Sequence, residues 1–253
     1  MAAAVPPVAL VTGASRGIGR AIAQKLAARG ARVAVHYHAN AAAAQETLRS
    51  LAGTGHALFR ADVAEPAACA GLVEAVVKNF GRLDVLVNNA GIYEEHDIKA
   101  VSYAEWQTVW RRTLDTNLTG PANLAYLAVQ QMRQQGGGRL VNITSRAAFR
   151  GELTASAYAA SKAGLNIFGQ SLAKALAADN IYVYAIAPGW VETDMATATL
   201  TGPNRAEVMA QHPLGRVATP EEIADAAAWM AFDAPAPMTG AIVDINGASY
   251  LRT

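Results

Sequence analysis

The chain has 253 residues, a length that suits one large α/β domain. Hydrophobic residues make up 52% of the sequence and charged residues 16%. An average soluble domain has roughly 25% charged residues, so the low charge suggests that another subunit covers part of the surface. The 21 basic and 20 acidic side chains nearly cancel to a net charge of +1. This balance leaves no electrostatic basis for binding nucleic acid or a membrane surface.

The N-terminal sequence and the single cysteine predict a cytoplasmic protein. No Lys or Arg precedes the first apolar residues, and Pro6 and Pro7 interrupt them, which does not fit a secretory signal. No apolar run approaches the roughly 18 residues of a membrane helix. Cys69 lies in an alanine-rich stretch without a nearby thiol, so we expect a buried and unreactive side chain.

Apolar runs alternate with alanine-rich segments of helical length along the whole chain. The predicted strands are 8–11, 32–36, 57–60, 85–88, 140–143, 182–186 and 241–245, and the predicted helices include 19–29, 41–51, 67–80, 117–135 and 155–178. Short apolar strands separated by helices are typical of a parallel sheet covered on both faces. The pattern therefore predicts a doubly wound α/β fold, and the glycine-rich turn after the first strand favours it over a (β/α)₈ barrel.

No segment is typical of a domain linker, so residues 1–253 are expected to form a single domain. The alternation of strands and helices lapses between Gly189 and Pro220, where Thr, Pro and Gly are frequent. Long irregular segments in compact domains often serve function, and open α/β sheets bind ligands beyond the carboxyl ends of their strands. We expect residues 189–220 to form a lid, followed by a helix with Thr219 as its N-cap.

The segment TGASRGIG at positions 12–19 follows the first predicted strand and opens a helix. Glycines at such a turn allow the backbone to approach a pyrophosphate, and the helix N-terminus offers it free N–H groups. The segment predicts a dinucleotide site that includes Gly13, Ser15, Arg16, Gly17, Ile18 and Gly19.

The end of the second predicted strand reads Val35-His36-Tyr37-His38, without Asp or Glu. NAD-dependent Rossmann proteins place an acid there against the ribose 2′-hydroxyl. Its absence favours NADP(H) over NAD(H), with Tyr37 and His38 beside the cofactor. We expect a half-exposed strand for the two histidines. No metal site is predicted, because a third ligand is missing.

Tyr158 and Lys162 are four residues apart in a predicted helix, which places them on one face. A free tyrosine has a pKa near 10, too high for proton transfer near neutrality. A neighbouring ammonium group favours the phenolate and is expected to lower that pKa. The pair is thus a candidate proton donor and acceptor.

Taken together, the motifs resemble the short-chain dehydrogenase/reductase family, a Rossmann-fold group, over nearly the whole chain. The resemblance rests on the glycine motif and on Asp62-Val63, Asn88-Asn89-Ala90-Gly91, Asn117, Ser145, Tyr158-Ala159-Ala160-Ser161-Lys162 and Pro188-Gly189. The spacing of 13 residues between Ser145 and Tyr158 also matches the family.

The resemblance implies an enzyme and assigns roles to its residues. Tyr158 would donate a proton, Ser145 would hold the substrate oxygen, Lys162 would hold the nicotinamide ribose, and the main chain of Asn117 would organise a water. Arg16 would pair with the 2′-phosphate of NADP(H). The other cofactor contacts implied by the family are Asp62, Val63, Asn89, Ala90, Gly91, Pro188, Gly189, Val191 and Thr193.

Three functions remain open, of which the first is favoured. It is the reduction of a small ketone or keto sugar. The second is a 3-oxoacyl-ACP reductase of fatty acid synthesis, which the lid sequences ETDM and PLGR resemble, although Glu94 and Glu95 would repel an acidic carrier protein. The third is a non-catalytic cofactor-binding regulator, which the retained Ser145, Tyr158 and Lys162 disfavour.

The helices at 117–135 and 155–178 carry small or apolar residues around most of their circumference. A helix that is apolar all round must be buried, so one face is expected to meet a neighbouring subunit. The family resemblance implies a homotetramer built on these helices.

Overall fold

A seven-stranded parallel sheet forms the centre of the protein, seen in a computed structural model that describes residues 5–203 and 205–252. The strand order is β3-β2-β1-β4-β5-β6-β7. The strands are β1 (Val8–Val11), β2 (Arg32–Tyr37), β3 (Ala57–Arg60), β4 (Val85–Asn88), β5 (Gly138–Ile143), β6 (Ile181–Pro188) and β7 (Ile242–Ile245). All seven predicted strands are present, and the doubly wound Rossmann-like fold is confirmed.

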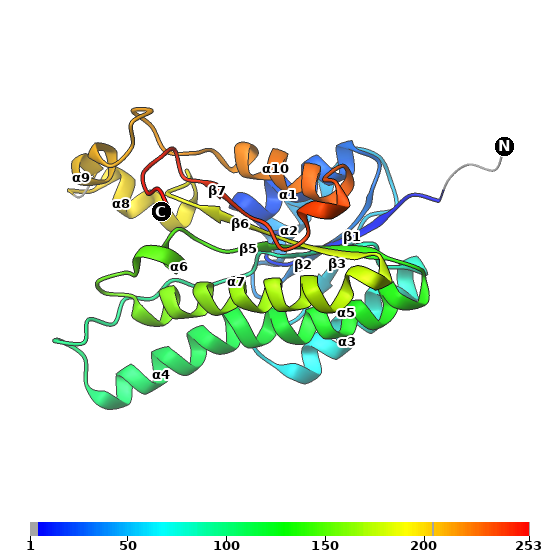
Figure 1. Ribbon diagram of the computed structural model, residues 1–253, viewed down its shortest axis with the longest axis horizontal. Helices are drawn as coiled ribbons and strands as arrows, with labels where there is room; N and C mark the ends of the chain where they lie inside the picture. The colour runs from blue at the N-terminus through cyan, green and yellow to red at the C-terminus, as the bar shows by residue number, and fades with distance from the viewer. Residues whose placement is uncertain (1–4, 204, 253) are drawn as a thin grey trace.

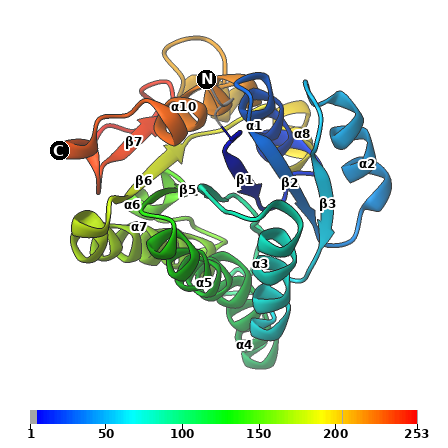
Figure 2. The same cartoon turned by 90° about the vertical axis from the view of Figure 1, so that its right-hand side faces the viewer.

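Helices cover both faces of this sheet (Figures 1 and 2). One face carries α1 (Gly17–Ala28) and α10 (Pro220–Phe232), and the other carries α3 (Pro66–Phe80), α5 (Gly120–Gln134) and α7 (Ser156–Leu176). Beside β3 lies α2 (Ala41–Ser50) (Figure 2). Among the described residues, none of the helices has the length and apolar character needed to cross a membrane.

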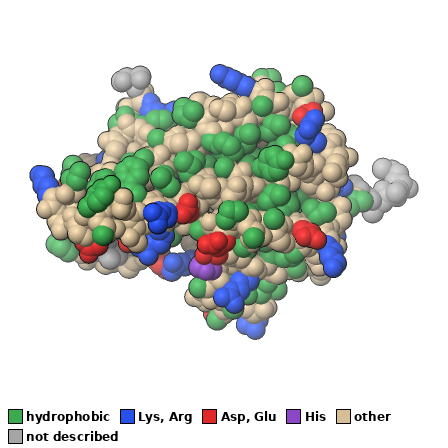
Figure 3. All heavy atoms as spheres, turned by 90° about the horizontal axis from the view of Figure 1, so that it is seen from below, with side chains coloured by type: hydrophobic (Ala, Val, Ile, Leu, Met, Phe, Trp, Pro, Cys, Tyr) green, Lys and Arg blue, Asp and Glu red, His purple; other side chains and the backbone are tan. Residues whose placement is uncertain are grey.

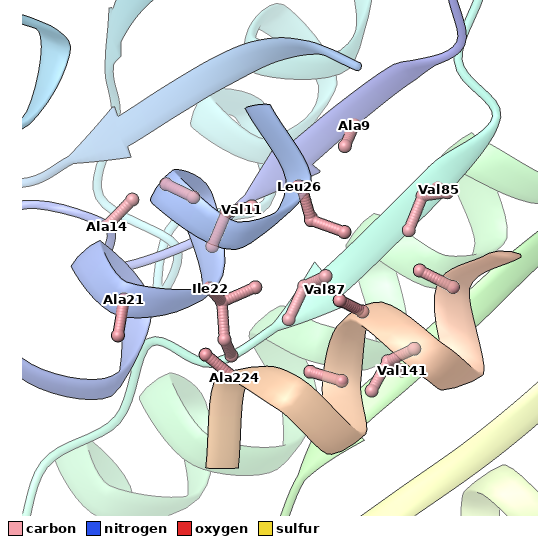
Figure 4. Close-up of a cluster of buried hydrophobic side chains, with 14 of the residues drawn as sticks. Ala9, Val11, Ala14, Ala21, Ile22, Leu26, Val85, Val87, Val141 and Ala224 are labelled. Atoms are coloured by element: carbon pink, nitrogen blue, oxygen red, sulfur yellow. The ribbon is translucent and has the colours of Figure 1, made fainter. Parts of the chain in front are cut away.

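Alternate side chains of the central strands point to opposite faces of the sheet and pack into two separate hydrophobic cores. Figure 4 shows Val11 and Val87 pointing from β1 and β4 toward Ile22 and Leu26 of α1. On the opposite face, Leu10 and its neighbours pack against α3 and α5. Strands buried on both faces read as continuous apolar runs, which is why the sequence revealed them.

The strand order reverses at β1, which pairs with β2 on one side and β4 on the other. At such a switch point the connections leave in opposite directions, and a crevice opens beyond the carboxyl ends of the strands. The loops after β1, β4, β5 and β6 therefore meet at one edge of the sheet, hereafter the carboxyl edge.

Two elements differ from the sequence prediction. The lid segment is not irregular throughout, because it contains α8 (Asp194–Thr201) and α9 (Arg205–Ala210). Threonines in α8 have weak helix propensity, so the sequence did not predict a helix here. The predicted helix at 117–135 starts with a π-helical turn, η1 (Asp115–Thr119), before α5, and α4 (Tyr103–Leu114) precedes it. Thr219 does cap α10, as its hydroxyl accepts from the Glu222 amide.

Candidate active site

The glycine loop between β1 and α1 is held against the end of β4. The Thr12 hydroxyl accepts hydrogen bonds from the amides of Asn89 (2.9 Å) and Ala90 (3.0 Å), and the Asn89 side chain donates to the Thr12 carbonyl at 2.8 Å. A Cβ on Gly19 would lie 2.3 Å from the Gly13 carbonyl oxygen. Only glycine permits this approach.

The loop and the start of α1 fit the diphosphate of a dinucleotide. Gly13 and Gly17 have positive φ angles of 63° and 52°, which turn the backbone ahead of the helix. Arg16 is the N-cap of α1, and its side chain makes no capping bond, while the first turn holds no acidic residue. The first helical N–H groups are thus free of side-chain caps, as an anion site requires. Ser15 and Ile18 belong to the same loop and turn.

His36 lies beneath the glycine loop and is buried, contrary to the expectation of a half-exposed strand residue. Its Nδ1 accepts from the Gly13 amide at 3.1 Å, and its Nε2 lies 3.2 Å from the Ala61 carbonyl oxygen. Burial lowers the pKa of His36 to about 4. The ring is therefore neutral, with its proton on Nε2, and joins the ends of β1, β2 and β3.

Basic side chains lie at or just beyond the carboxyl ends of β1, β2 and β3, namely Arg16, His38 and Arg60. Arg16 is exposed, and its Nη1 lies 3.8 Å from the Asp194 carboxylate of the lid. The His38 Nε2 lies 3.6 Å from the Asp62 carboxylate. Arg60, which sequence analysis missed, donates from Nε to the His38 carbonyl at 3.1 Å. Tyr37 ends β2 next to this group, and Val63 follows Asp62 as a buried residue.

Lys162 and Tyr158 lie on one face of α7, as their spacing predicts. The buried Lys162 ammonium donates to the Ile143 carbonyl at 2.9 Å and lies 5.7 Å from the centre of the Tyr158 ring. A Cβ on Gly91 would lie 3.4 Å from this ammonium. Burial lowers the pKa of Lys162 to about 8.

The structure does not bear out the expected effect of Lys162 on Tyr158. Burial raises the pKa of Tyr158 to about 12, and a hydrogen bond with Ser145 offsets only part of that rise. The groups that shift it do not include Lys162, whose ammonium donates to the Ile143 carbonyl and lies 5.7 Å from the centre of the Tyr158 ring. The phenol consequently stays protonated at neutral pH. The Ser145 hydroxyl also accepts from the Ala147 amide at 3.1 Å, which fixes its place.

Asn117 sits in the π-helical turn η1 and is fully buried. Its side chain accepts from the Ile92 amide at 2.8 Å and donates to the Ile92 carbonyl at 2.9 Å. It also donates to the Ser161 hydroxyl at 3.2 Å, which in turn donates to the Tyr158 carbonyl at 2.7 Å. Single π-turns inside α-helices occur frequently at functional sites. Here the turn links the loop after β4 to the helix that carries Tyr158.

The segment after β6 folds back onto the glycine loop. Gly189 donates its amide to the Ile245 carbonyl at 3.0 Å, directly after Pro188. Val191 is buried and bridges to Ala218. A Cβ on Gly17 would lie 3.3 Å from the Thr193 methyl group. The start of the lid thus lies over the proposed diphosphate position.

The loop after β4 brings an aromatic side chain to Tyr158 and carries two acidic residues directly after it. The Tyr93 ring meets the Tyr158 ring edge-on, with centres 5.1 Å apart. Glu94 forms an ion pair with Arg112, and Glu95 accepts from the Thr154 hydroxyl at 3.1 Å. Sequence analysis did not identify Tyr93, because its contact with Tyr158 depends on how the loop after β4 folds.

A protein-family model described as "Enoyl-(Acyl carrier protein) reductase" matches residues 13–248. The chain belongs to the short-chain dehydrogenase/reductase family. It is therefore an oxidoreductase that uses a nicotinamide cofactor, as the sequence resemblance implied.

Curated relatives cover almost the whole chain. The 3-oxoacyl-(acyl-carrier-protein) reductase FabG of Escherichia coli is 39% identical over 244 residues, which are 96% of this chain and 97% of that protein. The enzyme of the same name from Staphylococcus aureus is 37% identical over 245 residues, 96% and 98% of the two chains. The cis-4-hydroxycyclohexanecarboxylate dehydrogenase of Sinomonas cyclohexanicum is 40% identical over 242 residues, 95% of each chain.

These names change the order of the substrate predictions. Several relatives are named for reduction of a 3-oxoacyl group on a carrier protein. The comparisons thus support the acyl-thioester alternative better than the small free ketone or keto sugar that the sequence analysis favoured.

Proposed function

We propose that the protein catalyses NADP(H)-dependent reduction of a ketone to a secondary alcohol, with a 3-oxoacyl thioester as substrate. The convergence of Ser145, Tyr158 and Lys162 beside the end of β5 carries the proposal. The FabG relatives, similar along their whole length, support the thioester. Within this proposal residues 1–253 act as a single domain whose lid is 189–220.

Each residue then has a defined task. When bound, the cofactor supplies hydride from C4 of its nicotinamide to the carbonyl carbon. Tyr158 gives its phenolic proton to the substrate oxygen, and Ser145 donates a hydrogen bond to that oxygen as negative charge develops. The pKa of about 12 keeps Tyr158 protonated before the reduction. It also makes the phenol a weak acid, so the proton moves as hydride transfer makes the substrate oxygen a more basic alkoxide.

Lys162 and Asn117 contribute to this step by holding the cofactor and the surrounding backbone in place. The Lys162 ammonium has one acceptor in the Ile143 carbonyl, which leaves further donors for the nicotinamide ribose. The Asn117 side chain is occupied by Ile92, so it holds the π-turn in place. Its main chain is left for the water that resupplies protons toward Lys162.

The preference for NADP(H) rests on the charges near the end of β2. Arg16, His38 and Arg60 bring cationic or protonatable groups to this place. The strand itself supplies no acid at Tyr37 or His38 to repel a 2′-phosphate.

A small alicyclic alcohol bearing a carboxylate is the second candidate substrate. The Sinomonas relative acts, by its name, on such a compound and matches this chain as well as the FabG enzymes do. One structural feature counts against a carrier-bound substrate, although it does not itself attract a carboxylate: Glu94 and Glu95 lie on the loop that carries Tyr93, which contacts Tyr158. Such acidic residues would repel an acidic carrier protein.

The proposed assembly is a homotetramer built on α5 and α7. Tyr126 of α5 is 67% exposed and Ile167 of α7 is 63% exposed. Figure 3 shows hydrophobic side chains spread over this face of the molecule. A second copy would cover them, in keeping with the low charge content.

A coupled assay tests the reaction and separates the substrates. Oxidation of NADPH is followed with acetoacetyl thioester, 4-oxocyclohexanecarboxylate and a neutral cyclic ketone, and repeated with NADH. The proposal expects turnover of the thioester with NADPH. Turnover of the cyclic keto acid alone would favour the second candidate, and no NADPH oxidation with any carbonyl compound would refute the proposal.

A further inference from the structure

Arg146 directly follows Ser145 and is almost completely buried, with 3% of its surface exposed. Its amide donates to the Pro188 carbonyl at 2.8 Å, which fixes its backbone between the ends of β5 and β6. The nearby α6 (Ala147–Arg150), the lid helices and the C-terminal segment all lie at the same end of the molecule (Figure 1). The Arg146 guanidinium is thus on the substrate side of the carboxyl edge.

The guanidinium meets only neutral partners. Arg146 donates from Nη1 to the Ser249 hydroxyl at 2.5 Å and from Nη2 to the Gln211 amide oxygen at 3.3 Å. Arg150 donates to the same Gln211 oxygen at 3.1 Å. Among residues 5–203 and 205–252, no carboxylate pairs with Arg146 within 4.0 Å, while Glu152 pairs with Arg150 at 3.6 Å.

Two cations converge on one amide oxygen, the buried Arg146 from inside the protein and Arg150 from the exposed end of α6. A buried charge without an opposite charge is costly. Burial, and next the charge of Arg150, lower the pKa of Arg146 to about 10, against a smaller opposing effect of Glu152. The group still carries its proton at neutral pH. A guanidinium fork binds a carboxylate through two parallel hydrogen bonds, which Gln211 cannot match.

We propose that Arg146 and Arg150 form a binding site for a carboxylate group of the substrate, which takes the place of the Gln211 amide oxygen. Gln211 lies just beyond α9 in the lid. Replacement of its amide oxygen by the substrate carboxylate would therefore break a contact between the lid and the two arginines. The inference rests on the proposed oxidoreductase function. The carboxylate could belong to a free keto acid or to the far end of a 3-oxodicarboxylic monothioester.

Matched pairs of substrates test the site. One pair is 4-oxocyclohexanecarboxylate and its methyl ester, and the other is a 3-oxodicarboxylic monothioester and acetoacetyl thioester. We expect the acid to exceed its neutral partner in kcat/KM by about 10- to 100-fold in at least one pair, as for hydrogen bonds to charged groups. The pair that shows the preference identifies the source of the carboxylate.

Variants then assign the preference to the two arginines. Arg146→Gln should abolish the ratio between acid and neutral partner, and Arg146→Lys should restore part of it. Gln211→Glu places a carboxylate inside the protein and should raise KM for the acid. Arg49→Gln, on the exposed face of α2, serves as the control and should keep the ratio.

A binding measurement separates this inference from the proposed reaction. Cyclohexanecarboxylate has no carbonyl to reduce, and it should raise the Tm of the wild-type protein and of Arg49→Gln, but not that of Arg146→Gln. Cyclohexanecarboxamide should raise none of them. Equal turnover of acid and neutral partner in both pairs would overturn the site while leaving the reductase proposal intact. Absence of any turnover, with the Tm shift retained, would overturn the reductase proposal alone.

Discussion

The two sides of the carboxyl edge are built by different means. On the cofactor side, the ends of β1, β2 and β4 are joined by backbone hydrogen bonds, one threonine hydroxyl and the buried ring of His36. On the substrate side, Arg146, Gln211 and Ser249 come from segments far apart in the chain and meet through side chains alone. The first arrangement is fixed by glycines and short turns, and the second depends on how the lid packs.

This difference explains what the sequence could predict. Gly13, Gly17 and Gly19 were identified because close backbone approach leaves no other residue type possible. The five central strands were found because burial makes them almost continuously apolar, and the edge strands β3 and β7 were found from short apolar runs although they are only half-buried.

The environments of Arg146, His36 and Tyr158 could not be predicted from the sequence, because they depend on residues far away in the chain. Arg146 looks like an ordinary loop arginine until Gln211 and Ser249 surround it. The burial of His36 depends on the turn after β3 that presents the Ala61 carbonyl. The pKa of Tyr158 was predicted in the wrong direction, because spacing reveals its neighbour Lys162 but not the burial that raises the pKa.

Among the residues around Tyr158, the largest effect is expected at Ser145, where the cofactor side and the substrate side of the carboxyl edge meet. Ser145→Ala removes the donor to the developing oxyanion and should lower kcat about 10²- to 10³-fold, as for the loss of one such donor. The Tm should stay close to that of wild type. Ser50→Ala, at the exposed end of α2, is the control. A loss of less than threefold in Ser145→Ala would show that the substrate oxygen lies elsewhere.

The next effect concerns pH and the cofactor side. The pKa of His36 is about 4 in the folded protein and 6.5 in the unfolded chain. Its contribution is complete above pH 6.5 and is lost as the pH falls toward 4, because only the unfolded chain takes up the proton. The loss should reach about 2 kcal/mol of unfolding free energy by pH 5.

Urea denaturation at pH 7.5 and pH 5 measures this loss. His36→Gln should show a smaller difference between the two pH values than wild type. His38→Gln should keep most of the difference, since burial lowers the pKa of His36 more than the charge of His38 does. If His36→Gln behaves as wild type does, the ring is not buried in its neutral form.

A change in stability of similar size is expected at Gly19. A methyl group there meets the Gly13 carbonyl at 2.3 Å, and overpacking of this kind costs about 1–3 kcal/mol. Gly19→Ala should also weaken NADPH binding, measured by fluorescence titration. Gly71→Ala, where a Cβ meets nothing within 4 Å, should do neither. Unchanged NADPH affinity in Gly19→Ala would place the cofactor away from this loop.

The smallest effect is expected at Arg16, which lies at the surface between the glycine loop and the lid. Arg16→Gln should reduce the preference for NADPH over NADH about tenfold, since one charged hydrogen bond to the 2′-phosphate is lost. Equilibrium binding of the two cofactors measures it. An unchanged preference for NADPH would show that His38 and Arg60, and not Arg16, contact the 2′-phosphate.

Two neighbouring tyrosines provide the most direct test of the proposed chemistry. The rings of Tyr158 and Tyr93 lie 5.1 Å apart, but only Tyr158 has Ser145 as a hydrogen-bond partner and Lys162 one helical turn away. Single-turnover oxidation of NADPH by Tyr158→Phe should be about 10²- to 10⁴-fold slower than wild type, the range for a lost general acid. NADPH binding should be retained, and Tyr93→Phe should remain close to wild type. A Tyr158→Phe protein that reduces its substrate as fast as Tyr93→Phe does would contradict the account.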